Sequence, residues 1–538
     1  MPGRICITIL CFFLSSFLIL QPSLSFLNQL NNNFRKYNRR SDLLHSHAST
    51  STRPTIILGT ATTCSSDNKK LDEEDNFVGH KLILWRGEKT HGNSLQFRHA
   101  EFKSSLSTIL YERNEDYKDD ISFKFVSALS SDFDASESMS EYQITAYENA
   151  LQYVQVHHDG TNHSKENQNT GRFVDISNQM WIETVERCSL IRDIYEVVAV
   201  GITYEELAKN AIKNNLLDDM MINNGSSDDH KSWRIRLRQY GSTASTESKS
   251  KQYGKKMRSP MTQERNAVMQ LKELLINFGG GVDLKHADVS IYVMEGLISS
   301  QDGNRDKKVL ARLLTKGGGG NERSMSIIAP TTRICVTNTP LPPVEAFTLC
   351  NVARIKRGDR VLDPFAGSCT TLLAATMLTS NAVKTVGIEV AHNGQVNRAH
   401  ILDDFALRNL TMPAALIHGD AMDAIVREQA RASVNNEAFD VIVTDPPYNI
   451  RETTKFCVDP PLVQLVKCMA QDRRDGKRLL KKKGRLVSFV PNEQGHDVAL
   501  GMPSVQDLNE AGLEFCQMLE QPLNDSLSRW LVVYKCTR

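Results

Sequence analysis

Short apolar runs and helical segments alternate from residue 331 to the end of the chain, and this pattern constrains the fold more than any other feature. Helical spacing follows the first run as far as Leu378 and recurs at 395–407. Strands that alternate with helices are typical of a parallel sheet whose ligands lie beyond the carboxyl ends of the strands. We therefore predict an α/β domain over residues 331–538. The apolar runs lie at 360–362, 384–388, 414–417, 441–443, 486–490 and 531–534.

Residues 81–330 combine short apolar segments with long polar stretches, which indicates a second folded region with inserted loops. Apolar residues at 268–275 have the spacing of one helix face, and alternating β-branched residues at 289–293 predict a strand. The stretches 157–171 and 223–259 are too polar to build a core, so we predict that they form loops.

The first 60 residues differ in composition from the rest of the chain. They carry six basic residues and one acidic residue, so the formal net charge of +1 hides a net charge of −4 over the remaining 478 residues. An apolar run at 5–20 is short for a membrane-spanning helix and fits the core of a signal peptide. Small residues at 23–25, followed by a stretch rich in Asn, Ser and Arg, resemble the bipartite presequence of algae with secondary plastids. We predict a targeting presequence over 1–60 that leads to a plastid, with a signal anchor, a misassigned start or a cytoplasmic location as alternatives.

Composition also restricts the function classes. The charge balance excludes a uniformly basic nucleic-acid binder, so any RNA affinity must come from local patches. Eleven cysteines are scattered and never form Cys-x-x-Cys, so we predict neither a metal site nor a disulfide framework. No second apolar run has membrane length, and we predict no integral membrane association of the mature form.

Two motifs follow directly after predicted strands. Asp-Pro-Phe-Ala-Gly-Ser-Cys-Thr at 363–370 comes after the first strand, and Asp-Pro-Pro-Tyr at 445–448 comes after the fourth. A single four-residue match is a weak signal. Both motifs in this order, each at a strand end, are a strong one.

This ordered pair resembles the motifs of the S-adenosylmethionine-dependent amino-methyltransferases, which methylate exocyclic amines of adenine, cytosine or guanine. The segment 444–452 is most similar to the tRNA guanine-10 N2-methyltransferases, and 346–351, 485–487 and 528–531 continue the similarity. In the first half, segments 99–102, 201–207 and 282–288 resemble a THUMP-type RNA-binding domain. The resemblance implies a C-terminal Rossmann-like class I methyltransferase domain at 331–538, preceded by an α+β THUMP-like domain at 81–330.

The residue types at 445–448 suit this chemistry. The lone pair of an exocyclic guanine amine is delocalised into the ring, which makes the amine a poor nucleophile. Asp445 and the carbonyl of Pro446 can each accept a hydrogen bond from the amine, while Pro446 and Pro447 stiffen the loop. Tyr448 offers a face on which an extruded base can stack. We predict that these four residues are catalytic.

The cofactor S-adenosylmethionine is predicted to lie at the neighbouring strand ends. A turn at Gly367 allows close approach of the backbone, and Glu389 can accept hydrogen bonds from ribose hydroxyls. The position of Asp420 resembles the one that contacts the adenine ring. The predicted cofactor-binding residues are Asp363, Phe365, Ala366, Gly367, Ser368, Glu389, Asp420 and Ala421.

Two positions depart from the family pattern. Position 369 is Cys, where the family usually has Gly or another small residue, and this leaves the affinity for the cofactor open. Position 449 is Asn in place of the usual Gly, which is a mild change because Asn tolerates a left-handed backbone.

Two basic clusters are candidates for RNA contact. Residues 231–258 hold nine basic residues and one acidic residue, interleaved with Trp233, Tyr240 and Tyr253. This composition suits RNA, although a solvated loop would explain it equally well. The cluster at 473–485 is interpreted as a helix end stopped by Gly484. The predicted RNA-binding residues are Lys231, Arg234, Arg236, Arg238 and Lys285.

Together these features predict methylation of the N2 amine of guanine in tRNA, at position 10 by resemblance. Methylation of ribosomal RNA or of a DNA amine, and a catalytically weak RNA-binding scaffold, remain the alternatives. The family's eukaryotic members work with a small zinc-binding activator protein, so the resemblance also implies that partner.

Residues 1–60 fused to a fluorescent protein provide a test of the predicted address. We expect plastid fluorescence in an alga with secondary plastids because the segment has both parts of a bipartite signal. A cytosolic signal would end the plastid hypothesis.

Overall fold

The computed structural model describes most of the chain from residue 78 onward. The predicted presequence at 1–60, the polar stretch 159–171 and residues 241–258 of the basic cluster lie outside the described residues. The described segments are 78–86, 94–113, 121–129, 150–158, 176–221, 231–240, 261–297, 307–318, 325–390, 396–448, 459–493, 497–524 and 526–537.

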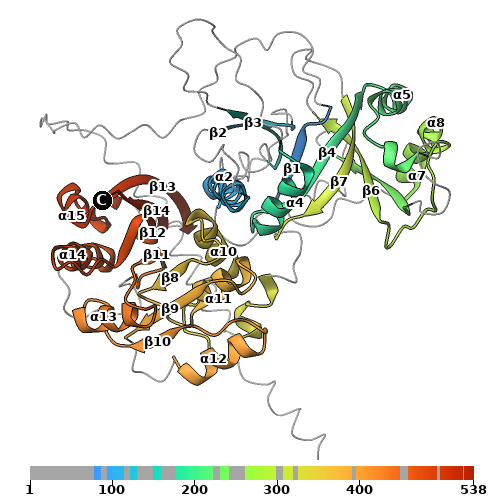
Figure 1. Cartoon of the computed structure of the whole chain (residues 1–538). Helices are drawn as coiled ribbons and strands as arrows, with labels where there is room; N and C mark the ends of the chain where they lie inside the picture. Colours follow the sequence, from blue (N-terminus) through green and yellow to red (C-terminus); the bar gives the residue numbers. More distant parts are fainter. Residues whose placement is uncertain are drawn as a thin grey trace, which may run out of the picture. The chain divides into compact units, whose positions relative to one another are not determined.

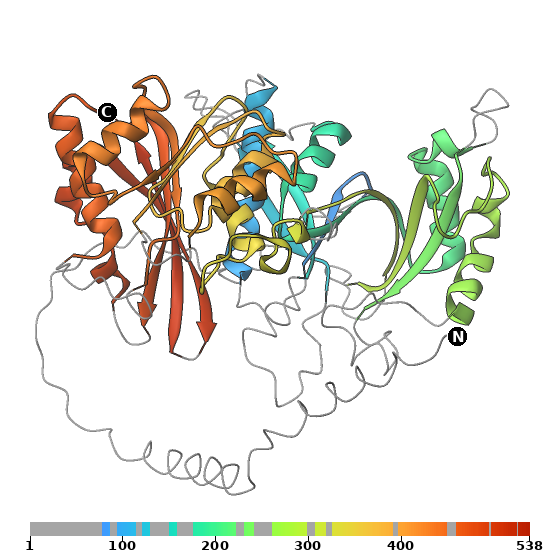
Figure 2. The same ribbon diagram turned by 90° about the horizontal axis from the view of Figure 1, so that it is seen from below.

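A seven-stranded sheet forms the centre of the C-terminal region, in the order β10-β9-β8-β11-β12-β14-β13. The first five strands pair in parallel, and β14 runs antiparallel between β12 and β13. Figure 2 shows the long last strands side by side. This arrangement confirms the predicted Rossmann-like α/β domain. The strands are β8 (Arg360–Asp363), β9 (Lys384–Glu389), β10 (Ala415–His418), β11 (Phe439–Thr444), β12 (Leu480–Glu493), β13 (Leu513–Asn524) and β14 (Leu527–Cys536).

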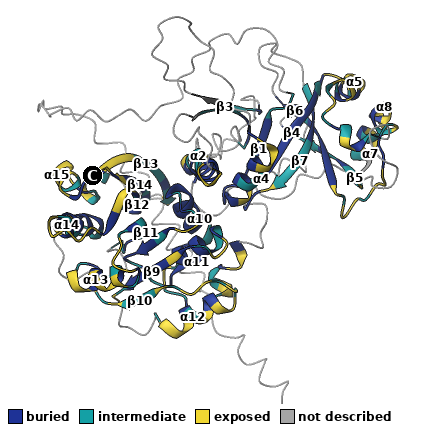
Figure 3. Ribbon diagram, in the orientation of Figure 1, coloured by how far each residue is buried: buried dark blue, intermediate teal, exposed yellow. Residues whose placement is uncertain are grey.

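Helices cover both faces of this sheet, and successive strand residues explain why. Val361 and Val441 point into one apolar core, whereas their neighbours Leu362 and Ile442 point into the other. A strand that is buried on both faces is apolar along nearly its whole length. For this reason these strands could be recognised in the sequence, and Figure 3 shows that they are buried. The first core holds α10 (Pro343–Val352), α11 (Thr370–Leu378) and α12 (Arg398–Ala406), and the second holds α13 (Ala424–Ala432), α14 (Pro461–Arg474) and α15 (Val505–Ala511).

The structure corrects the interpretation of the cluster at 473–485. Helix α14 ends at Arg474 with Asp475 as its cap, and β12 already begins at Leu480. Gly484 therefore lies within β12 and does not stop a helix. A Cβ atom on Gly484 would lie 2.7 Å from the carbonyl oxygen of Asp440, so a larger side chain would clash there.

A second seven-stranded sheet lies in the N-terminal region, in the order β2-β3-β1-β4-β7-β6-β5 (Figure 1). Its pairs are antiparallel except β5 with β6. Its strands are β1 (Lys81–Trp85), β2 (Ile121–Ser127), β3 (Leu151–His158), β4 (Ile191–Gly201), β5 (Trp233–Gln239), β6 (Val289–Leu297) and β7 (Lys307–Lys316). Its helices are α2 (Leu95–Glu112), α4 (Asn178–Arg187), α5 (Tyr204–Asn214), α7 (Met261–Gln270) and α8 (Lys272–Leu275). The expected helix at 268–275 is thus two short helices, and the expected strand at 289–293 is β6.

Strand β5 corrects a second prediction. It lies inside the stretch 223–259 that was predicted to be a loop. Alternate residues Trp233, Ile235 and Leu237 are buried in an apolar core, and the intervening arginines hide this alternation in an otherwise polar stretch. A strand with one buried face needs only every second residue to be apolar.

A buried carboxylate joins helix α2 to the C-terminal region. Glu101 is fully buried and accepts hydrogen bonds from the backbone N–H of Ser189 at 2.8 Å and of Leu190 at 2.9 Å. The hydroxyl of Ser189 donates at 2.7 Å, and the side-chain amide of Asn351 in α10 donates at 2.8 Å. Burial raises the pKa of Glu101, and the four donors oppose that shift. The carboxylate therefore connects α2, the turn after α4, and α10.

Within the described residues, no helix combines the length and the apolar character that crossing a membrane requires.

We expect Glu101→Ala to lower the free energy of unfolding by about 3 kcal/mol or more, because several buried donors would lose their acceptor together. Urea unfolding followed by circular dichroism measures this. Glu112→Ala on the same helix is the matched control, since Glu112 is exposed and accepts one hydrogen bond, from the N–H of Arg357 at 3.0 Å. That change should cost less than about 1 kcal/mol, and equal losses would contradict the role of Glu101.

Candidate active site

Four parallel strands end at one edge of the C-terminal sheet. β8 ends at Asp363, β9 at Glu389, β10 at His418 and β11 at Thr444. Because these strands are parallel neighbours, the loops that follow them lie along the same edge. The structure thus brings both sequence motifs together.

Asp363 organises this edge. Its carboxylate accepts hydrogen bonds from the hydroxyl of Thr371 in α11, from the hydroxyl of Thr444 at 2.7 Å, and from the N–H of Phe365 at 3.1 Å. Burial raises the pKa of Asp363 to about 6 from its usual 3.8, against the effect of these donors. Donors within the chain therefore surround this carboxylate. Asp363 links the loop after β8 to the end of β11.

The loop after β8 is held by backbone contacts and by an arginine. The N–H of Ala366 donates to the carbonyl of Ile388 at 2.9 Å, and the N–H of Gly367 donates to Glu389 at 2.7 Å. Arg333 binds the carbonyl of the buried Ser368 and donates to its hydroxyl at 3.3 Å. Ser368 thus faces Arg333, so its polar atoms stabilise the loop.

Gly367 and Cys369 both have positive φ angles, of 49° and 63°. This explains why a glycine is expected at position 369: an L-residue pays a steric cost in the left-handed region. Cys369 is also buried, at 1% exposure, as the N-cap of α11. Cys in place of Gly at position 369 therefore adds backbone strain, and it does not place a bulky side chain at the loop surface.

Among the other predicted cofactor residues, Phe365 follows β8, Glu389 ends β9, and Asp420 and Ala421 follow β10. Asp420 is exposed and accepts from the N–H of Met422 at 2.8 Å. Ala421 is buried, and its carbonyl accepts from Arg427 at 3.0 Å. Phe365 packs at the margin of the second core. Glu389 thus ties the Gly367 turn to β9, and the carboxylate of Asp420 stands at the surface of the next loop.

The segment 445–448 continues β11 into the site. The hydroxyl of Tyr448 donates to Oδ1 of Asp445 at 2.6 Å. Burial raises the pKa of Asp445, and the positive charge of Arg529 opposes that rise. Burial and the neighbouring Asp445 raise the pKa of Tyr448, so its hydroxyl stays protonated at neutral pH.

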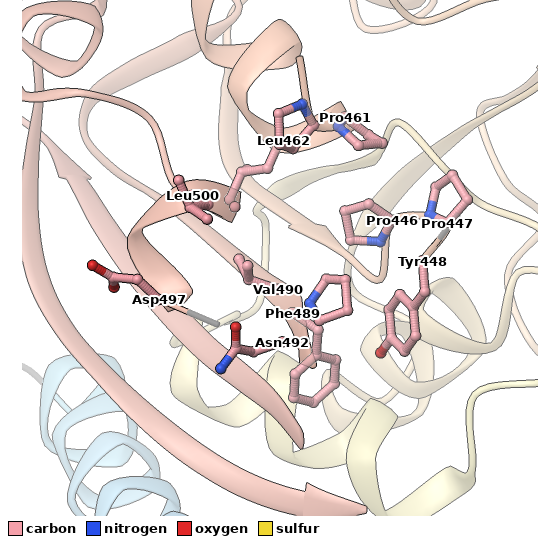
Figure 4. Close-up of a pocket in the computed structure, with 13 residues that line it drawn as sticks. Pro446, Pro447, Tyr448, Pro461, Leu462, Phe489, Val490, Asn492, Asp497 and Leu500 are labelled. Carbon is pink, nitrogen blue, oxygen red and sulfur yellow. The ribbon is translucent and has the colours of Figure 1, made fainter. Parts of the chain in front are cut away.

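A pocket of about 270 Å³ opens beside this segment. Figure 4 shows Pro446, Pro447 and Tyr448 on one side of it and Val490 and Leu500 on the opposite side. Prolines and aliphatic side chains form most of its wall, and Asn492 and Asp497 add polar groups. A mostly apolar wall with a few polar groups suits a flat heterocyclic ligand.

The sequence analysis missed two buried arginines that support the site. Arg333 holds the loop after β8. Arg529 donates to Gln521 at 2.6 Å, pairs with Glu345 at 3.3 Å and stacks over Phe489, which lines the pocket. Arg529 belongs to the segment 528–531 that resembles the family, but no spacing rule connects it with the pocket. Its position beside Phe489 depends on the pairing of β14 with β12.

The predicted RNA-binding arginines lie on β5 and have partners within the chain. Arg238 is largely buried, stacks over Tyr292 at 4.5 Å and pairs with Asp193 at 3.1 Å. Trp233 and Tyr240 are buried as well, so the proposed alternation of basic and stacking aromatic residues is wrong for 233–240. These aromatic side chains pack in the core of the N-terminal sheet and are therefore not available to stack on RNA bases.

Arg234 and Arg236 support a neighbouring loop. Arg236 donates to the carbonyl of Leu284 at 2.8 Å, and Arg234 donates to the carbonyl of Lys285 at 3.2 Å. Lys285 itself is exposed on that loop, and Lys231 is exposed and pairs with Asp219 at 3.4 Å. Lys231 and Lys285 thus remain accessible, whereas Tyr253 and Asn449 lie outside the described residues.

Comparison with known proteins identifies the C-terminal region. Residues 330–506 match the RMKL-like methyltransferase domain family. This match supports the predicted methyltransferase domain in this part of the chain.

Curated relatives match part of the chain. A tRNA (guanine(10)-N2)-dimethyltransferase from Methanothermobacter thermautotrophicus is 30% identical over 114 residues, which cover 21% of this chain and 29% of the relative. The rat tRNA (guanine(10)-N(2))-methyltransferase is 28% identical over 127 residues, covering 22% and 27%. The chain thus spans less than a third of the length of these relatives. The crystal structure of TrmN from Thermus thermophilus aligns over 85% of this chain and 99% of that chain, with 15% identity and a TM-score of 0.37.

We expect Cys369→Gly to be more stable than Cys369→Ala by about 1 kcal/mol, because both variants lose the thiol and only glycine is free of left-handed strain. Chemical unfolding of both variants measures the difference. Cys350, buried inside α10, provides the control. There alanine should exceed glycine by about 0.5–1 kcal/mol, and the same order at position 369 would contradict the strain argument.

Proposed function

We propose that the protein transfers a methyl group from S-adenosylmethionine to the N2 amine of a guanine in tRNA. The match of residues 330–506 to the RMKL-like methyltransferase domain family supports this proposal. The observation that carries the proposal is the position of Asp445. It lies at the end of β11, beside the apolar pocket and one strand away from the loop of Gly367.

Asp445 and the carbonyl of Pro446 would accept the two hydrogen bonds of the target amine. This arrangement favours a pyramidal nitrogen whose lone pair is directed away from the ring. Since positive charge develops on the nitrogen during transfer, both acceptors bind the transition state more strongly than the ground state. Each hydrogen bond to a charged group contributes about 1.5–3 kcal/mol.

Tyr448 would form the stacking face for the base. Its hydroxyl is held by Oδ1 of Asp445 at 2.6 Å, so ring and carboxylate are oriented together. Pro446 and Pro447 line the same pocket and restrict the backbone of the loop. A base extruded from the RNA would thus meet a preorganised surface.

The residues at the neighbouring strand ends fit the cofactor. Glu389 and Asp420 place carboxylates at two adjacent strand ends, which suits a ribose diol and an adenine amine. The backbone at Gly367 is open, because a Cβ atom added there would have Cγ2 of Thr337, at 3.9 Å, as its nearest neighbour. When bound, S-adenosylmethionine supplies an electrophilic methyl group on a sulfonium centre.

We propose that tRNA also contacts the N-terminal region through the loop that carries Lys285. Arg234 and Arg236 hold the backbone of this loop, so their contribution to binding is indirect. The family resemblance supports the THUMP-like character of this region and the small zinc-binding activator, and the composition of residues 1–60 supports delivery to a plastid.

Labelled-methyl transfer to tRNA transcripts tests the function. We expect incorporation into a transcript with guanine at position 10 and strongly reduced incorporation when another base replaces it. Equal incorporation would refute the position, and transfer to ribosomal RNA alone would refute the substrate class. Adding the activator to the purified chain shows whether the chain needs it.

We expect Asp445→Ala to lower kcat at least 100-fold, since it removes an acceptor that acts mainly in the transition state. Calorimetry should show S-adenosylmethionine affinity within about threefold of the unchanged protein. Asp475→Ala, at the exposed end of α14, is the control and should retain activity. Full activity of Asp445→Ala would exclude the proposed catalytic role.

A further inference from the structure

Two residues of the loop after β8 have left-handed backbone conformations, Gly367 with a φ of 49° and Cys369 with a φ of 63°. Glycine adopts this region readily, whereas a residue with a Cβ atom pays a steric cost there. A strained conformation persists only where the surrounding structure fixes it. Contacts from outside the loop must therefore hold Cys369 in place.

Arg333 supplies such contacts on both sides of Cys369. Its guanidinium binds the carbonyl oxygen of Ser368, donates to the hydroxyl of Ser368 at 3.3 Å and donates to the hydroxyl of Thr370 at 2.7 Å. Ser368 and Thr370 are both buried, and 1% of the side chain of Arg333 is exposed. The planar guanidinium, with its several donors, thus fixes the residue before and the residue after Cys369.

Arg333 is itself held by Asp404 in α12, which is fully buried. Nε of Arg333 pairs with Oδ2 of Asp404 at 3.4 Å. The carboxylate of Asp404 also accepts hydrogen bonds from the backbone N–H of Ile334 at 2.9 Å and of Cys335 at 3.0 Å. Arg408 pairs with the same carboxylate at 2.9 Å. The guanidinium of Arg333 and the backbone that follows it are thus both fixed.

The loop that Arg333 holds also orients Glu389. The N–H of Gly367, which precedes Ser368, donates to Oε2 of Glu389 at 2.7 Å. Glu389 ends β9 and carries the carboxylate that fits the ribose diol of the cofactor. If the loop left its left-handed conformation, this hydrogen bond would break and the carboxylate would lose its orientation.

We propose that Arg333 is a positioning residue for S-adenosylmethionine and that it offsets the strain which cysteine introduces at position 369. The inference rests on the proposed function for its ligand, S-adenosylmethionine. In this role Arg333 acts through Ser368 and Gly367 and does not touch the cofactor itself. A glycine at position 369 would need less of this support.

The test is a calorimetric titration of the full chain with S-adenosylmethionine in the absence of RNA. We expect Arg333→Gln to weaken the affinity at least about tenfold, because the strained loop is then free to relax. In the Cys369→Gly background the same change should weaken the affinity less than about threefold, because glycine adopts the left-handed region readily. An equal loss in both backgrounds, or no loss, would overturn the proposal.

Cys369→Ala separates the effect of strain from the loss of the thiol. Alanine retains the Cβ atom and therefore the left-handed strain. In the Cys369→Ala background, Arg333→Gln should thus again weaken the affinity at least about tenfold. If alanine relieves the loss as well as glycine does, strain is not the cause and the proposal fails.

Arg187→Gln is the matched control, because Arg187 binds the opposite end of the same helix. Arg333 contacts α11 at its first residue, Thr370, whereas Arg187 donates to the carbonyl of its last residue, Leu378, at 3.3 Å. Arg187 is buried and, like Arg333, binds backbone carbonyls. Its loss should lower stability and leave the affinity for S-adenosylmethionine within about twofold. An equal loss of affinity would show a general effect of packing and would sink the proposal.

Arg333→Lys provides the test if Arg333→Gln does not fold. Lysine retains the charge beside Asp404, but a single ammonium group cannot hold Ser368 and Thr370 with the geometry of a guanidinium. We expect at least about threefold weaker binding, which Cys369→Gly should relieve. Unchanged affinity, or a loss that persists in the Cys369→Gly background, would contradict the proposed role.

Binding and methyl transfer together separate this proposal from the proposed function. If the unchanged protein methylates tRNA and Arg333→Gln keeps its affinity, the role of Arg333 alone fails. If the unchanged protein binds S-adenosylmethionine without methylating RNA, and Arg333→Gln binds it more weakly as expected, the proposed function fails and the role of Arg333 in binding stands. If the unchanged protein does not bind S-adenosylmethionine, both fail.

Discussion

The buried carboxylate of Glu101 is the interaction on which the arrangement of the described chain depends. It takes four hydrogen bonds from segments far apart in the sequence, among them Ser189 and Asn351. A buried charge is tolerated only where its acceptor sites are filled. Helix α2 is therefore held to α10, and its first turn reaches the strand that supports Arg529.

Buried polar side chains with filled hydrogen bonds also hold the candidate active site together. Asp363 joins the loop after β8 to the end of β11, and Arg333 fixes the loop after β8 at Ser368. Residues that would act on a substrate lie on loops, which are usually more mobile than the elements that they connect. Buried polar contacts restrain those loops, so Asp445 and Tyr448 are oriented before any ligand binds.

The parts that were predictable from sequence share a strong local signal. Strands such as β8 and β11 are apolar on both faces, and the motifs directly follow them. Strand β13 was missed because it is an edge strand whose burial does not alternate: residues 514–516 are all exposed and residues 517–520 are all half-buried. Strand β5 was missed because Arg234, Arg236 and Arg238 occupy its less buried face. Basic composition alone cannot distinguish a solvated arginine from one paired within the protein.

The sequence by itself determined the α/β architecture, the two motifs and the chemistry that they suit, because each depends on residues adjacent along the chain. Tertiary structure alone decided which charges support that chemistry. Antiparallel pairing of β14 with β12 places Arg529 over Phe489 at the pocket wall, where it also pairs with Glu345. The tertiary structure likewise turns Arg238 inward, toward Asp193 and two tyrosines. Charges act through space, and local sequence patterns do not record distances between strands.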